Sequence, residues 1–246
     1  YVSFNSNASS VGMVGGIVGC MAGKAENCEN SGIIVSDNYA GGIAGNLTGG
    51  RTNTYAQAYV SLENCRNYGE VYGNEDLVSA DETSGHAGGI VGNSGGGDTA
   101  GCDGGIIAGC INFGKVRASG AAGVVYQARE GTRIKHCANR NEIAATLVSV
   151  GLVGQIDWGG CSLESSYNAG RVTLTGEGGE KAVAYPIAGL LKTFVGNSPS
   201  HTVQKCYNDS TVYPCEDNAL AGANININAC YSVATSVFAT GEPANK

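Results

Sequence analysis

The sequence predicts an all-β protein, a single-domain parallel β-solenoid (β-helix) of about seven irregular coils with loop insertions that spans residues 1–246. Three observations favour this fold. Two short apolar phrases alternate along the chain, glycine is frequent, with 40 Gly in 246 residues, and no stretch has sustained helical periodicity. Stacked copies of such a unit bury a continuous core that one copy cannot form alone.

The first recurring phrase is Gly-Gly-aliphatic, often followed within two residues by another Gly. It occurs at residues 15–19, 41–45, 88–92, 122–125, 150–154, 188–191 and, in degraded form, 221–223. Its second position reads Gly16, Gly42, Gly89, Gly123, Gly151, Gly189 and Gly222. A recurring glycine indicates either a positive φ or a lack of room for a Cβ, so this position is expected to be a corner.

The second phrase has the pattern Cys-x-Asn-x-Gly-x-aliphatic. We predict that its first residues stack in one column, at the ~4.8 Å spacing of neighbouring strands. This Cys column consists of Cys28, Cys65, Cys110, Cys137, Ser166, Cys206 and Cys230. The shortest spacings indicate a coil of about 24 to 29 residues. The longer copies are expected to contain insertions at residues 46–62, 73–86, 93–107 and 174–186.

Two further positions of the second phrase are expected to form rows along the stack. The recurring Asn should bond its own copies through side-chain amides. With period-two spacing, the residue before the aliphatic position faces outward. That outward position reads Ile33, Glu70, Lys115, Glu142, Arg171 and Thr211. Its four charges alternate in sign, which an in-register stack favours because opposite charges on neighbouring strands attract.

The composition argues against two classes of partner. The net charge is -7 and no basic cluster is longer than two residues, so neither nucleic acid nor an anionic membrane surface is an expected partner. No run of about 18 apolar residues is present, so the chain is not expected to be embedded in a membrane. Because it begins at Tyr1, we expect a processed chain or a piece of a longer protein.

The cysteines are expected to pack rather than react. Six of the 10 occupy the Cys column, where parallel Cβ atoms ~4.8 Å apart exceed the ~3.8 Å of a disulfide. We therefore expect free thiols that pack as small apolar groups. The better candidates for disulfide bridges are Cys20, Cys102, Cys161 and Cys215. With three His and no CxxC pair, no metal site and no cofactor are expected.

The first phrase resembles the GLUG motif, Gly-Leu-hydrophobic-Gly, of bacterial surface proteins. Residues 151–154 match it fully, three other copies have Ile for Leu, and the copies at Gly123 and Gly189 have Tyr126 and Lys192 in place of the last Gly. The similarity covers nearly the whole chain. It implies a β-solenoid in a secreted adhesin or in the non-catalytic repeat region of an immunoglobulin A peptidase, and it brings no catalytic residue.

Two motifs match catalytic patterns by composition. Residues 92–96 satisfy GxSxG, but a nucleophile elbow needs a following helix and a placed His and acid, and His86 is too close in sequence to be an obvious partner. Residues 109–115 satisfy GxxxxGK, but Val116 replaces the required Ser or Thr. Both segments are expected to be ordinary parts of the repeat.

The alternative to a non-catalytic module is a polysaccharide lyase or glycoside hydrolase, because a β-helix can mount paired carboxylates in a groove. Asp157 and Glu164 flank Trp158, which makes this segment a candidate sugar site, although a solvated turn with one packed aromatic is the simpler interpretation. A second acidic segment lacks the ligand spacing of a calcium loop and is expected to be solvated. Its members are Glu75, Asp76, Asp81 and Glu82.

The outward position after the Cys column predicts the binding surface. It reads Glu29, Arg66, Ile111, Ala138, Tyr167, Tyr207 and Tyr231. Three tyrosines on consecutive coils form either an aromatic strip that binds sugar rings or a partner protein, or a cap over the C-terminal coil. The expected function is therefore a non-catalytic structural or adhesive module at the cell surface, with a glycan or protein ligand and Tyr167, Tyr207, Tyr231 and Trp158 as binding residues.

Overall fold

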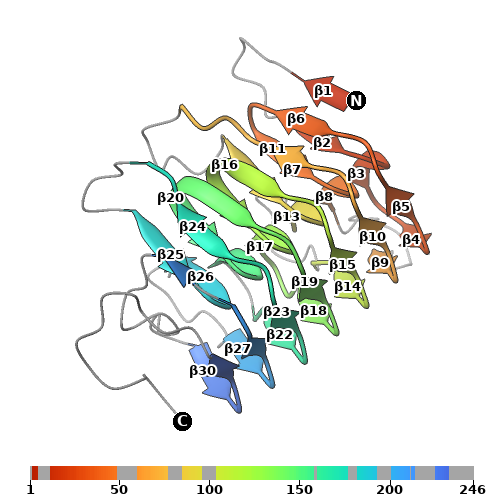
Figure 1. Ribbon diagram of the computed structural model, residues 1–246. Coiled ribbons are helices and arrows are strands. Elements are labelled where there is room, and N and C mark those ends of the chain that lie inside the picture. The colour runs from red at the N-terminus through yellow and green to blue at the C-terminus, as the bar shows by residue number, and fades with distance from the viewer. Residues whose placement is uncertain are drawn as a thin grey trace.

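The computed structural model describes most of the chain as strands joined by tight turns (Figure 1). The described residues are 2–4, 12–48, 60–76, 85–95, 104–157, 160–176, 182–192, 201–210, 212–213 and 225–232. Within these ranges there is no helix, and the strands form four sheets. The all-β fold is thus confirmed for the described part of the chain.

Sheet A forms mainly from strands at the end of the second phrase and at the start of the first phrase, and sheet B forms from strands at the end of the first phrase. Sheet A contains β1 (Val2–Phe4), β2 (Met13–Gly15), β6 (Ile34–Ser36), β7 (Tyr39–Gly41), β11 (Val71–Tyr72), β12 (His86–Gly88), β16 (Val116–Ala122), β20 (Ile143–Val150), β24 (Val172–Leu174), β25 (Val183–Tyr185) and β29 (Val212–Tyr213). Sheet B contains β3 (Val18–Met21), β8 (Ala44–Leu47), β13 (Val91–Ser94), β17 (Val125–Ala128), β21 (Val153–Asp157) and β26 (Ala188–Lys192).

Sheets C and D form from the strands before and within the second phrase. Sheet C contains β4 (Lys24–Glu26), β9 (Ser61–Glu63), β14 (Ile106–Ala108), β18 (Arg133–Lys135), β22 (Ser162–Glu164), β27 (His201–Gln204) and β30 (Ile225–Asn228). Sheet D contains β5 (Glu29–Asn30), β10 (Arg66–Asn67), β15 (Ile111–Asn112), β19 (Ala138–Asn139), β23 (Tyr167–Asn168), β28 (Tyr207–Asn208) and β31 (Tyr231–Ser232).

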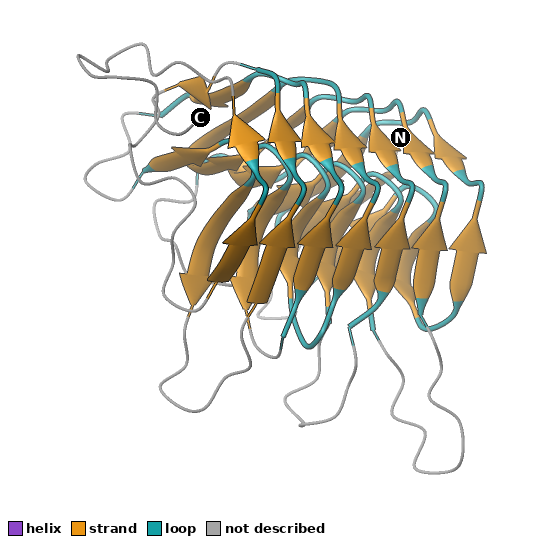
Figure 2. Ribbon diagram, turned by 90° about the horizontal axis from the view of Figure 1, so that it is seen from below, coloured by secondary structure: helices purple, strands orange, loops and turns teal. Residues whose placement is uncertain are grey.

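Neighbouring strands in each sheet are parallel and come from successive repeats, as their common direction in Figure 2 shows. We call each segment that supplies one strand to sheet C and one to sheet D a coil, together with the sheet B strand that precedes them in the first six coils. The coils follow one another from the N-terminal to the C-terminal end of the stack (Figure 1). This parallel, solenoid-like arrangement is consistent with the β-solenoid that the repeats predict.

The predicted stacking of the Cys column is confirmed. The residue after each column member donates its N–H to the carbonyl of the preceding member, from Arg66 N to Cys28 O at 2.9 Å through Tyr231 N to Cys206 O at 2.9 Å. The strand register agrees, because Glu29 pairs with Arg66 and Tyr207 pairs with Tyr231. A shared phrase therefore sets the register along the whole of sheet D.

The recurring Asn forms the predicted ladder inside sheet D. From Asn30 to Asn168, each Nδ2 donates to the Oδ1 of the Asn on the next coil, at 2.7 to 2.9 Å, and that of Asn208 donates to Ser232 Oγ at 3.1 Å. Each Nδ2 also donates to the carbonyl two residues ahead in its own coil. Its members are Asn30, Asn67, Asn112, Asn139, Asn168 and Asn208, all of them buried. Since each amide from Asn67 to Asn208 is bonded to the coils on both sides, the ladder fixes the coils one above another.

The second-glycine position is a corner without room for a side chain. None of Gly16, Gly42, Gly89, Gly123 and Gly151 has a positive φ. A Cβ on Gly42 would lie 2.2 Å from Gly89 O and 2.4 Å from Asn67 Cγ. The other members of this glycine column face the Asn of their own coil in the same way. The lack of space, rather than the backbone conformation, therefore requires glycine here.

The copy at residues 188–191 was aligned wrongly from the sequence. Ala188 pairs with Val153, and Val150 pairs with Tyr185, so Gly189 occupies the last position of its phrase and Pro186 replaces the second Gly. Lys192 consequently does not stand at that last position. Glycine occurs at several places in the phrase, so a Gly-aliphatic pair matches in more than one register. The copy at residues 221–223 lies outside the described residues.

A second corner precedes sheet D and was not recognised from the sequence. The residue directly before each column member is left-handed, with φ between 48° and 65°. These residues are Asn27, Asn64, Gly109, His136, Ser165, Lys205 and Ala229. The residue types differ from coil to coil because their side chains are exposed or half-buried, so no recurring type marks this turn.

Apolar side chains fill the space inside the stack. The largest buried cluster joins sheets B, C and D and includes Leu47, Leu62 and Leu152. A second cluster lies within sheet A and includes Ile34 and Val116. The predicted insertions were too wide at their ends, because β8, β9, β13, β14 and β25 reach into the ranges 46–62, 93–107 and 174–186. Strands begin or end inside these ranges because their residues continue the in-register core.

Candidate functional site

The outward face of sheet D brings the three predicted tyrosines together. Tyr167 pairs with Tyr207, and Tyr207 with Tyr231, on consecutive coils. Tyr207 is 40% exposed and Tyr231 56% exposed, whereas Tyr167 is half-buried. The rings point outward because the alternate residue of each strand, Asn168 or Asn208, points inward to the Asn ladder.

Tyr167 is contacted by an arginine from the preceding coil. The guanidinium carbon of Arg140 lies 5.4 Å from the centre of the Tyr167 ring, and Arg140 Nε donates to the Tyr167 hydroxyl at 2.7 Å. These distances place the guanidinium at the hydroxyl end of the ring, so a charged donor fixes the Tyr167 hydroxyl. No repeat pattern predicts this contact, because Arg140 stands at a different position of the phrase, directly after the Asn.

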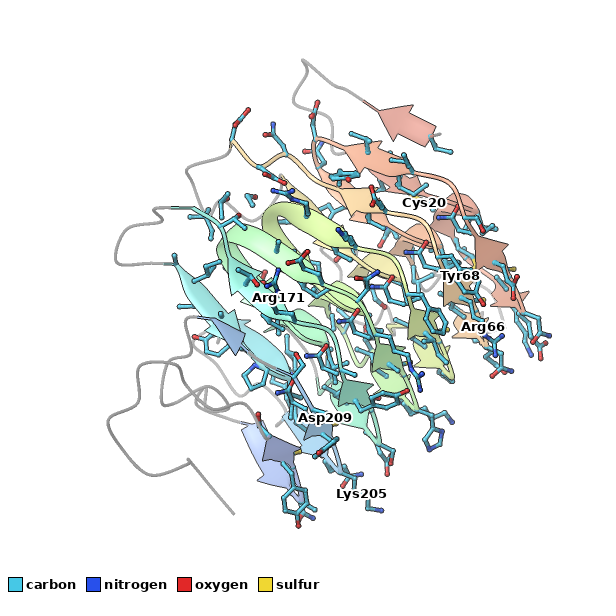
Figure 3. The ribbon with its side chains drawn as sticks, in the orientation of Figure 1. Cys20, Arg66, Tyr68, Arg171, Lys205 and Asp209 are labelled. Carbon is cyan, nitrogen blue, oxygen red and sulfur yellow. The ribbon has the colours of Figure 1, made fainter. Side chains whose placement is uncertain are left out.

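Two further aromatic residues lie on the same face. Tyr68 and Phe113 occupy the position after the Asn on neighbouring coils, and their rings stack with centroids 5.0 Å apart and planes at 7°. Tyr68 is 46% exposed (Figure 3). Reading the second outward position down the repeats would have found this pair.

The row of alternating charges lies beside this face. The residue after each charge donates its N–H to the next charged residue's carbonyl, as from Val71 to Lys115 at 2.9 Å and from Ile143 to Arg171 at 2.8 Å. The predicted stacking of this row is thus confirmed from Ile33 to Arg171. Arg171 forms an ion pair with Glu142, while Thr211 lies outside the described residues.

The candidate sugar site around Trp158 is only partly described. Trp158 itself lies outside the described residues, Asp157 is the last residue of β21 in sheet B, and Glu164 is the last of β22 in sheet C. In the acidic segment, Glu75 forms an ion pair with Arg117 at 3.0 Å. Asp81 and Glu82 are outside the described residues.

The two motif matches lie in ordinary strands of the repeat. Ser94 is fully buried in β13, and its hydroxyl is 3.0 Å from the Thr132 hydroxyl. His86 is buried too, with its ring stacked 4.1 Å from that of Tyr126. The segment from Gly109 to Lys115 contains strand β15, with no helix after it that would resemble a phosphate-binding loop.

The column cysteines are free thiols with a structural hydrogen bond. Each Sγ lies 3.3 to 3.6 Å from the carbonyl two residues earlier, across the left-handed corner. Ser166 makes the same bond at 2.8 Å. The hydrogen bond with the next thiol, then burial, raises the pKa of Cys65, which keeps this thiol protonated as a donor. The position therefore requires a small donor, which explains why Ser replaces Cys.

The four cysteines outside the column are spread along the chain. Cys20 is an exposed free thiol on β3, and Cys161 is buried next to β22, with its backbone N–H donated to His201 Nδ1 at 3.1 Å. Cys102 and Cys215 lie outside the described residues, so their predicted bridging is not tested. Among the side chains that the structure describes, no group of three His, Cys, Asp or Glu is placed to hold a metal ion.

Comparisons with known proteins gave no match. No family model matches the chain, and neither the curated proteins nor the solved structures contain a match. In the described ranges, no helix has the length and apolar character needed to cross a membrane.

Proposed function

We propose that this chain is a single parallel β-solenoid of about seven coils and serves as a non-catalytic adhesive module of a bacterial surface or secreted protein. Its ligand is a glycan or a partner protein outside the cell, and the strip Tyr167, Tyr207 and Tyr231 contacts that ligand. The resemblance of residues 151–154 to the GLUG motif supports the placement in this class of proteins.

The observation that supports this proposal best is the exposure of in-register tyrosines on a rigid sheet. Tyr207 and Tyr231 expose 40% and 56% of their surface, although the adjacent Asn208 is fixed by the buried ladder and donates to Ser232, which follows Tyr231, at 3.1 Å. A flat ring with a hydroxyl tip offers both an apolar face and a hydrogen bond, and rigid aromatic residues lose little entropy on binding.

A double substitution tests the strip against a capping role. Tyr167→Ser with Tyr207→Ser should abolish retention of the purified chain on a printed panel of oligosaccharides and immobilised collagen, with little change in melting temperature. Tyr72→Ser is the matched control, since Tyr72 lies on strand β11 of sheet A and not on sheet D. If the double variant melts much lower but the fraction still folded is retained as well as the wild type, the tyrosines are a cap and the proposal is wrong.

A further inference from the structure

One planar side chain per coil lies on the outward face of sheet D over six of its seven strands. These groups belong to or directly follow β10, β15, β19, β23, β28 and β31. We call the row the aromatic ridge, and its members are Tyr68, Phe113, Arg140, Tyr167, Tyr207 and Tyr231. The three-tyrosine strip is therefore only the C-terminal half of a longer feature.

The N-terminal half of the ridge is one column. Phe113 donates its N–H to Asn67 O at 2.7 Å, and Arg140 donates its N–H to Asn112 O at 2.9 Å, so both occupy equivalent places on consecutive coils. Tyr68 stands at the same place one coil earlier and stacks on Phe113 with the ring planes at 7°. The ring stack and the coil repeat therefore run in the same direction.

Arg140 connects the two halves. It stands in the column of Phe113, but its guanidinium reaches across to the Tyr167 ring, which belongs to the column on the other side of the Asn ladder. From Tyr167 onward the ridge continues through paired tyrosines to Tyr231. The ridge thus crosses the sheet obliquely without a missing coil, over five strand spacings of ~4.8 Å, or about 24 Å.

We propose that the aromatic ridge binds one linear, uncharged polysaccharide of β-linked six-membered sugar rings, which lies along the stack with about one ring per coil. The proposal rests on the proposed function and deepens it by naming the ligand class and its orientation. The rings of an extended β-linked polysaccharide recur at a spacing close to that of the coils, so successive rings meet equivalent groups. The exposed ring surfaces and the hydroxyl tips of the ridge offer such a ring apolar contact and hydrogen bonds.

The width of the ridge favours a narrow polymer over a folded protein. A stable protein interface covers about 800 Å² on each partner and is usually broad. Each coil has two outward positions, one on either side of the inward Asn, and the ridge uses one of them per coil, so its planar groups form a narrow row. A chain of sugar rings can contact every member of such a row, whereas a globular surface touches only part of it.

The charges around the ridge favour a neutral polymer. Beside it, Glu70, Lys115, Glu142 and Arg171 alternate in sign along the stack. Their fields largely cancel, so a polyanion gains no net attraction from this flank. Sugar hydroxyls can instead donate to the carboxylates and accept from the cations. Arg140 adds one cation to the ridge, and this cation is bonded to the Tyr167 hydroxyl, so the alternating flank remains complementary to an uncharged, hydroxyl-rich chain.

The test uses cello-oligosaccharides of two to eight rings and isothermal titration of the purified 246-residue chain. Affinity should rise by about 3- to 10-fold with each ring up to six and then level off, since each ring adds one contact worth about an aromatic pair. The variant Phe113→Ala should weaken cellohexaose binding by about 3- to 10-fold and leave cellobiose binding almost unchanged. Val35→Ala, on strand β6 of sheet A, should bind like the wild type.

Three outcomes separate the two proposals. Length-dependent affinity that Phe113→Ala reduces supports the ridge. The ridge proposal is wrong if affinity levels off at three rings, Phe113→Ala leaves affinity unchanged and Tyr207→Ala lowers it. The tyrosine strip would then remain the binding site. If no cello-oligosaccharide, xylohexaose or chitohexaose binds at millimolar concentration, the proposed ligand class is wrong. The adhesive function would still be supported if the chain is retained on immobilised collagen and this retention depends on Tyr167 and Tyr207.

Discussion

The corner before sheet B and the corner before sheet D use glycine in opposite ways. At the corner before sheet B, the column from Gly16 to Gly151 is invariably glycine although no member has a positive φ. At the corner before sheet D, every φ lies between 48° and 65°, yet only Gly109 is glycine. Steric preference alone predicts the reverse, because left-handed backbone normally selects glycine.

The two corners differ in the direction in which a Cβ atom points. At the first corner it would point into the stack, against the Asn ladder and the next coil's carbonyl. At the second corner the side chains of residues such as His136 and Lys205 are exposed, and the adjacent Cys or Ser bonds the carbonyl across the turn. Recurring glycine in this chain therefore indicates close packing. The left-handed turn is instead stabilised by the hydrogen bond of the adjacent Cys or Ser.

The strongest test of this comparison is Gly89→Ala. The added Cβ would lie 2.2 Å from Gly123 O and 2.4 Å from Asn112 Cγ, and the first of these is backbone. We expect a loss of about 4 kcal/mol or more in unfolding free energy, measured by urea titration with circular dichroism. Gly23→Ala is the control, because nothing lies within 4 Å of its Cβ, and should change stability by less than about 0.5 kcal/mol. Equal urea midpoints for the two variants would contradict a steric role for the glycine column.

Residues whose type recurs could be placed from the sequence, and residues whose type varies could not. Cys, Asn and the aliphatic position of the second phrase each stand at one place, so their shared order fixed the strand register. The phrase at Gly189 was misaligned because glycine serves at several places in it. The left-handed corner was missed because seven coils use six residue types there.

The candidate site shows the same limit. Tyr167, Tyr207 and Tyr231 were found because they share one position of the repeat. The link through Arg140 depends on a side-chain conformation that crosses between columns, which no periodic pattern encodes. The exposed fraction of each tyrosine could not be predicted from the sequence either, since it depends on the side chains of the neighbouring coil.

The Asn ladder against which the glycine column packs gives the second test. Asn112 is fully buried, accepts from Asn67 at 2.9 Å and donates to Asn139 and Gly114 at 2.8 Å, so Asn112→Ala leaves buried partners unbonded. We expect a loss of about 3 kcal/mol by urea titration.

The matched control is Asn93→Ala on sheet B. Asn93 is equally buried and donates to Asn46 at 3.0 Å and Gly95 at 2.8 Å, but its Oδ1 has no partner among the described residues. We expect a loss of about 1 to 2 kcal/mol, because fewer bonds are broken. A loss at Asn93 as large as that at Asn112 would show that continuity of the ladder adds nothing.

The smallest expected effect has the opposite sign and concerns the second corner. His136 has φ of 54° and an exposed side chain, and its N–H donates to Glu164 O at 3.1 Å, a bond that glycine keeps. Glycine relieves about 1 to 2 kcal/mol of left-handed strain but loses more entropy on folding, so His136→Gly should stabilise the protein by about 0.5 kcal/mol. Lys135→Gly, one residue earlier in strand β18, should instead destabilise it by about 0.5 to 1 kcal/mol. Matched urea titrations give both values, and a loss at His136 equal to that at Lys135 would show that the left-handed backbone costs this coil nothing.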